Sequence, residues 1–202
     1  MKAANKILNF SAEKYLKTAG DLFIYEGEYE SALKMVDKSL EIAPEEVRAL
    51  ILKGDILYCL NNDLEALEAF NTALSIDENS VEALVSRAGV LDMLGKTRDA
   101  LKSCELAFEV IRPHQAYLLQ TLYEQYLLLL IRLKKYRQAQ IALIKAQHQL
   151  PKEEAAMLRA SYFTLITRLC QERHKRTHRA AHIRIAQHQA DHLTPPKAKQ
   201  NL

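Results

Sequence analysis

One repeat length organises most of this chain. Ala32, Ala66 and Ala100 are each separated by 34 residues, and Ala139 follows after a further 39. Equal spacing over several units is typical of arrays in which one supersecondary structure packs on the next copy of itself. The period therefore predicts a repeat array instead of one globular core. The longer last interval predicts about five inserted residues near 115–119.

Each unit has the pattern of a helical hairpin. Apolar residues of the second unit share one helix face: Ala66, Leu67, Phe70, Ala73 and Leu74. A turn signal, such as Asn61-Asn62, separates this helix from an earlier one in the same unit. Prolines stand at or beside the unit boundaries, where they end helices: Pro44, Pro113 and Pro151. The chain has only five Gly and five Pro in 202 residues, so we expect an all-α fold.

A small residue recurs at one helix crossing of the first three units. Gly20, Gly54 and Ala88 are each 34 residues apart. A short or missing side chain lets two elements approach closely. We therefore expect two backbones to lie close together at this crossing.

These features resemble the tetratricopeptide repeat (TPR), a 34-residue helix–turn–helix unit. The segment "GEYESALKMVDKSLEIAP" (27–44) resembles the second half of such a repeat, and "NDLEALEAFNTALSIDEN" (62–79) follows it. The resemblance implies a TPR-type α-solenoid of about four hairpins, a right-handed superhelix with a C-terminal capping helix. We expect an N-terminal segment at 1–12, four repeats at 13–46, 47–80, 81–114 and 120–153, and a capping helix at 154–173. A basic, His-rich helical extension with a disordered tail is expected at 174–202.

The resemblance also implies a concave groove, lined by the first helix of each hairpin. Its projected lining mixes apolar, aromatic and charged residues: Lys17, Asp21, Tyr25, Arg48, Ile51, Asp55, Tyr58, Val85, Asp92, Met93, Glu124, Leu128 and Arg132. Such a lining suits a peptide with apolar anchors and some positive charge. The alternative for Ile51, Val85 and Leu128 is packing between hairpins. The family's clamp for C-terminal carboxylates is not expected, because Asp21 and Asp55 stand where Asn is needed.

Nothing in the sequence predicts catalysis. The chain has no GxSxG, HExxH or phosphate-binding glycine loop, so we expect a protein that is not an enzyme and has no cofactor and no metal site. The three cysteines form no CxxC pair. Cys104 and Cys170 are expected as small buried residues. A reactive thiol at Cys59 is the alternative for the groove.

The C-terminal tail differs in charge from the rest of the chain. Residues 168–202 carry eight Lys/Arg against two Asp/Glu, a net charge of +6, whereas residues 1–167 carry −3. The basic tail residues are Arg173, Lys175, Arg176, Arg179 and Arg184. His174, His178 and His182 share a helix face, but the neighbouring cations oppose a metal ion. A solvated helix end and phosphate contacts to nucleic acid both stay open.

The expected function is a protein–protein interaction module, an adaptor or assembly scaffold, that binds a partner's peptide segment in the groove. The alternatives are a TPR-type secretion chaperone holding a client protein and nucleic-acid binding through the tail. Homo-oligomerisation also stays open. The sequence has no apolar run long enough for a signal sequence or a membrane span, so a cytoplasmic location is expected.

Overall fold

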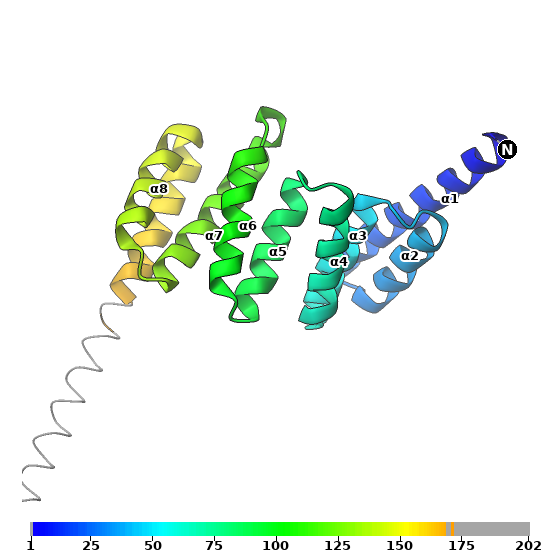
Figure 1. The fold of residues 1–202 in the computed structure, drawn as a ribbon, viewed down its shortest axis with the longest axis horizontal. Helices are drawn as coiled ribbons and strands as arrows, with labels where there is room; N and C mark the ends of the chain where they lie inside the picture. The colour runs from blue at the N-terminus through cyan, green and yellow to red at the C-terminus, as the bar shows by residue number, and fades with distance from the viewer. Residues whose placement is uncertain (1, 169–170, 172–202) are drawn as a thin grey trace, which may run out of the picture. The chain divides into compact units, whose positions relative to one another are not determined.

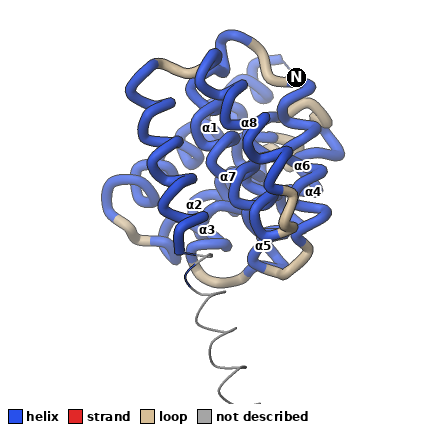
Figure 2. The backbone as a smooth tube through the Cα atoms, turned by 90° about the vertical axis from the view of Figure 1, so that its left-hand side faces the viewer, coloured by secondary structure: helices blue, strands red, loops and turns tan. Residues whose placement is uncertain are grey.

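The computed structural model describes residues 2–168 and 171, with side chains from residue 10 onward. The chain divides into two compact units, residues up to Leu158 and residues from Arg159. Across the described part, every regular element is a helix (Figure 2). The predicted all-α class is therefore confirmed.

The first unit is a succession of antiparallel helix pairs in chain order (Figure 1). Its α-helices are α1 (Lys2–Asp21), α2 (Tyr29–Ile42), α3 (Val47–Cys59), α4 (Asp63–Ile76), α5 (Val81–Met93), α6 (Thr97–Val110), α7 (Leu119–Arg132) and α8 (Tyr136–Gln149). A π-helical turn, η1 (Leu22–Glu26), extends α1, and a 3-10 helix, η2 (Pro113–Leu118), precedes α7. Residues 152–168 are helical, and the division between the units falls inside this range.

Packing in the first unit is between neighbours. Each α-helix contacts the next one along the chain, and the first helices of successive hairpins also touch, α3 with α5 and α5 with α7. The repeated alanines lie at these contacts and are fully buried: Ala32, Ala66, Ala100 and Ala139. A methyl group at each of these positions lets the helices of a hairpin approach closely while still burying apolar surface.

The turn inside each hairpin also repeats, now in backbone conformation. Gly27, Asn61, Gly95 and Lys134 have φ angles of 68°, 61°, 74° and 60°. These positions follow the spacing of the repeated alanines. A left-handed residue at this point reverses the chain between the two helices, and glycine adopts this conformation without a steric penalty.

The expectation for Gly20, Gly54 and Ala88 needs correction. A Cβ placed on Gly54 would lie 2.5 Å from Cε1 of Phe70, so the missing side chain leaves room for a ring and not for a second backbone. A Cβ on Gly20 would meet nothing within 4 Å. A small residue is therefore required by packing at Gly54. The same packing requirement does not apply at Gly20.

Two regions depart from the strict repeat. Helix α1 begins at Lys2 and runs through the expected boundary between residues 12 and 13. The additional residues before the fourth hairpin form η2, which begins at Pro113. A proline suits this place because it has no backbone N–H to lose at the first helical position.

Candidate functional site

The exposed side of the first helices is the surface that the repeat pattern singles out. We define the first-helix face as the accessible side chains of α1, η1, α3, α5 and α7. Most projected groove residues are exposed there: Lys17, Asp21, Tyr25, Arg48, Tyr58, Met93, Glu124 and Arg132. Ile51, Asp55 and Leu128 are half-buried, whereas Val85 and Asp92 are only 8% exposed. The last two therefore offer little surface to a ligand.

An apolar row lies at the C-terminal ends of the first helices. The row consists of Ile24, Tyr25, Tyr58, Cys59 and Met93, five of the six residues at two equivalent positions of three successive hairpins. The sixth residue is the buried Asp92. Tyr25 is 80% exposed, Met93 61% and Tyr58 39%. Large exposed apolar groups that repeat in register form a surface suited to partner contact.

The row begins in the π-helical turn η1 and ends at the fourth hairpin. Ile24 and Tyr25 belong to this turn, in which the backbone N–H of Gly27 bonds to the carbonyl oxygen of Leu22. π-turns inside helices are often found at functional sites. In the fourth hairpin the corresponding residues are the buried Ile131 and the charged Arg132. The apolar row therefore spans the first three hairpins.

Polar contacts join each first helix to the next. Arg48 on α3 lies 2.9 Å from the carboxylate of Glu13 on α1. Arg132 on α7 lies 3.2 Å from the buried carboxylate of Asp92 on α5. These projected groove residues thus already have partners within the array, which orient them and reduce their freedom to bind a ligand.

Asp55 makes the corresponding contact between α3 and α5. Its carboxylate accepts a hydrogen bond from Ser86. Burial nevertheless raises the pKa of Asp55 from 3.8 to about 6, because desolvation of the charged form outweighs the hydrogen bond. Asp55 consequently takes up a proton in mildly acidic solution, where an ordinary aspartate stays charged.

The thiol of Cys59 lies in the apolar row but is not activated. Burial raises its pKa, and the negative charge of Asp55 raises it further. A thiol reacts as the thiolate, so both effects reduce its nucleophilicity. Cys104 is buried, as the sequence predicts, and burial raises its pKa to about 12.

Two further polar contacts come from residues that the sequence did not indicate, each to a glutamate of the first-helix face. Tyr117 on η2 donates a hydrogen bond of 2.7 Å to Glu82 on α5. Gln120 donates to Glu124 within 3.0 Å on α7. The repeat period gave no signal for Tyr117, because this residue belongs to the insertion.

A pocket where the first helix of the fourth hairpin meets two second helices was also not predicted. It has a volume of about 450 Å³ and lies between α6, α7 and α8. Three aromatic rings line it: the Phe108 ring lies 4.8 Å from that of Tyr123 and 5.2 Å from that of Tyr126. Glu105 and Glu109 stand on its α6 wall and Lys145 on its α8 wall. The aromatic residues Phe108, Tyr123 and Tyr126 are visible in the sequence, but their gathering around one pocket can be seen only in the three-dimensional structure.

The tail hypotheses fall on residues that the structure does not describe. Arg173, Lys175, Arg176, Arg179 and Arg184 lie outside the described residues, as do the paired histidines and Cys170. Within residues 2–168 and 171, no three His, Cys, Asp or Glu side chains gather closely enough to hold a metal ion. No helix in this same part is both long and apolar enough to cross a membrane.

Comparison with known proteins gives the same architecture. Residues 47–80, the range expected for the second repeat, match the model of the tetratricopeptide repeat family. No curated protein sequence matches the chain significantly. Three solved structures are similar in fold. PilF of Pseudomonas aeruginosa has 19% identity and a TM-score of 0.64, covering 79% of this chain and 72% of that chain. MamA has 16% identity and a TM-score of 0.62, covering 72% and 81%. The TPR2B domain of yeast Sti1, in a complex with pHsp70, has 20% identity and a TM-score of 0.55, covering 58% and 94%.

The stacked hairpins, their repeated buried alanines and their left-handed turns define an α-solenoid of helix–turn–helix units. Residues 47–80 match the tetratricopeptide-repeat family model, and the chain shares its fold with solved tetratricopeptide-repeat structures.

Proposed function

We propose that this protein is a non-enzymatic adaptor that binds a peptide segment of a partner protein on its first-helix face. The observation that carries the proposal is the apolar row, because three hairpins present large exposed side chains in register. A row of this kind provides anchor sites along an extended or helical peptide. The complex of the Sti1 TPR2B domain supports the general mode of binding, since that domain has the same fold.

The charges beside the row indicate the character of the peptide. Asp21 and Glu124 are exposed on the first-helix face, and Glu82 is half-buried there. The lysines and arginines that project from the same face are partly engaged, Arg48 with Glu13 and Arg132 with Asp92. We therefore expect a ligand with apolar anchors and a net positive charge.

A cytoplasmic location is part of the proposal and rests on the sequence alone. The roles of secretion chaperone and nucleic-acid binder stay predictions, the second because it depends on tail residues outside the described part of the chain.

The test uses peptides selected against the full chain from a random displayed library. The dissociation constant of a selected peptide is then measured for the wild type and for Tyr58→Ala combined with Met93→Ala. Removing two anchors should weaken binding by about tenfold or more.

The matched control is Leu64→Ala combined with Ile76→Ala, because both residues are exposed apolar side chains on α4. This control should bind like the wild type. Equal losses in the two double variants, or no loss in the first, would show that the apolar row is not the binding surface.

A further inference from the structure

The pocket between α6, α7 and α8 shares no lining residue with the apolar row and has its own chemistry. Its α6 wall carries the carboxylates of Glu105 and Glu109, against the single ammonium group of Lys145 on α8, which leaves a net charge of −1 (one cation, two anions). Its aromatic wall is formed by Phe108, Tyr123 and Tyr126. Its volume of about 450 Å³ falls within the range of roughly 300–1,000 Å³ found for ligand pockets.

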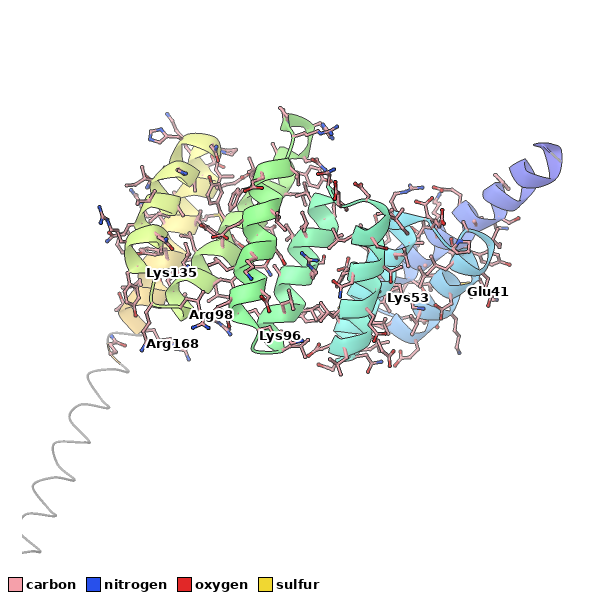
Figure 3. All side chains as sticks on the ribbon, viewed as in Figure 1. Glu41, Lys53, Lys96, Arg98, Lys135 and Arg168 are labelled. Atoms are coloured by element: carbon pink, nitrogen blue, oxygen red, sulfur yellow. The ribbon has the colours of Figure 1, made fainter. Side chains whose placement is uncertain are left out.

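The equivalent places in the earlier hairpins show which charged groups the repeat uses here. We call the contact between the second helix of one hairpin and the first helix of the next a junction. Asp37 and Glu41 on α2 precede Glu105 and Glu109 by 68 residues each, which is two repeat lengths. The first-helix residue that faces Asp37 is Lys53 on α3, whose Nζ lies 2.7 Å from the Asp37 carboxylate. Figure 3 labels Glu41 and Lys53 on these neighbouring helices. At the first junction the chain thus supplies both the carboxylate and the cation.

The other two junctions each lack one of the two groups. At the second junction Arg87 takes the place of Lys53, but Asn71 takes the place of Asp37, so the carboxylate is missing. The Arg87 guanidinium instead donates to the Ser103 hydroxyl within 3.2 Å. The third junction has the carboxylate of Glu105, but Tyr126 stands where the lysine would be, 73 residues after Lys53 (34 plus 39). No salt bridge to Glu105 or Glu109 forms among the residues that the structure describes.

We propose that this pocket binds a lysine side chain of a partner polypeptide, which supplies the cation that the third junction lacks. The ammonium group pairs with Glu105 and lies against the Tyr126 ring, because a cation is attracted to an aromatic face. The aliphatic stem of the lysine packs on Phe108 and on Ile141, which is 49% exposed.

The charge state of Tyr126 is compatible with the same ligand. Burial raises the pKa of Tyr126, and the negative charge of Glu105 raises it further, so the phenol stays neutral. The Tyr126 ring therefore offers a neutral aromatic face beside the Glu105 carboxylate. This site does not rest on the proposed function of the first-helix face, and either can fail without the other.

The experiment is an NMR titration of the full chain with two short capped peptides, Gly-Gly-Lys-Gly-Gly and the same peptide with norleucine. Norleucine keeps the aliphatic stem and lacks the ammonium group, so it is the matched probe. The lysine peptide should shift the amide signals of residues 105–109 and 138–145. The norleucine peptide should bind roughly three- to tenfold more weakly, as expected for a lost, partly exposed ion pair and cation–π contact.

Two variants locate the site. Glu105→Gln should weaken the lysine peptide by a similar roughly three- to tenfold factor. Tyr126→Lys should abolish binding, because it restores the pair seen between Lys53 and Asp37 inside the chain. Tyr58→Ala, on the first-helix face, should leave the titration unchanged.

Several outcomes would overturn the proposal. They are equal binding of the norleucine and lysine peptides, undiminished binding by Glu105→Gln, or signal changes confined to the first-helix face. Circular dichroism shows whether Tyr126→Lys folds. If it does not, Glu105→Gln decides the question alone, since this change from an exposed carboxylate to an amide leaves the packing in place.

Discussion

The substitution Gly54→Ala tests how tightly two successive helices are fitted together. Gly54 on α3 is buried, and a Cβ there would lie 2.5, 2.6 and 2.9 Å from three atoms of the Phe70 ring on α4. Real Cβ atoms essentially never come within 3.0 Å of another heavy atom. The ring has no easy escape, because Phe70 is 0% exposed and packs with Leu57, Ala66 and Val90.

The expected magnitude follows from two opposing effects. Alanine is favoured over glycine inside a helix by about 1 kcal/mol. Overpacking a closely filled core costs about 1–3 kcal/mol, and a contact this short belongs at the upper end. Gly54→Ala should therefore lower the free energy of unfolding by about 2 kcal/mol.

Gly20→Ala is the matched control, one repeat earlier on α1. A Cβ there meets nothing within 4 Å, so only the helical preference acts and the free energy of unfolding should rise, by about 0.5–1 kcal/mol. Urea denaturation followed by circular dichroism measures both variants. The reasoning is refuted if both substitutions change the stability in the same direction.

A double-mutant cycle identifies the ring as the cause. Phe70→Leu shortens the side chain that the new methyl group would strike. In the Gly54→Ala background, Phe70→Leu should therefore cost at least about 1 kcal/mol less than it does alone. Additive effects would mean that the clash is relieved elsewhere.

Three further predictions concern the electrostatics, the turns and a buried hydroxyl. Because the pKa of Asp55 rises from 3.8 to about 6 on folding, the folded state binds the proton more tightly, and the free energy of unfolding should fall as pH rises between these values. Asp55→Asn should remove this fall and stabilise the protein above the higher pKa by up to about 3 kcal/mol, which denaturation curves on both sides of the window will show. Lys134→Gly should raise the melting temperature, since a left-handed conformation with φ of 60° costs a non-glycine residue about 1 kcal/mol, and Gly95→Ala should lower it. Ser39→Ala should lose about 1 kcal/mol in urea titrations, because the buried hydroxyl donates to the Ala12 carbonyl oxygen within 2.8 Å; an unchanged midpoint would contradict this.

The sequence predicted well those features that depend on one residue type at one repeated position. Ala66 and its equivalents are buried because every hairpin needs a small side chain at the same crossing. Gly27 and Gly95 occupy left-handed turns for the same local reason. Periodicity reports such positions directly, since the same steric demand returns in each unit.

Contacts between different hairpins were harder to predict. The pairing of Arg132 with Asp92 depends on two side chains 40 residues apart, and neither is distinctive alone. The pocket beside Tyr126 requires knowing which second-helix residues face it across a junction. Single-sequence patterns show which face of a helix is buried, but they do not show which polar groups meet across that face.

The neighbour-only packing of the hairpins has a consequence for how the protein opens. Opening the α1–α2 hairpin breaks one interface with the array, whereas opening the α3–α4 hairpin breaks two, so amide hydrogens in the middle of the first unit should exchange more slowly than those of α1 and α2. The apolar row extends from η1 to α5 and so includes residues of the end hairpin, which opens more easily, and of the middle hairpin, which opens less easily. A ligand lying along it ties the end hairpin to the middle one and slows fraying from the N-terminal end, which couples occupancy of this surface to local stability.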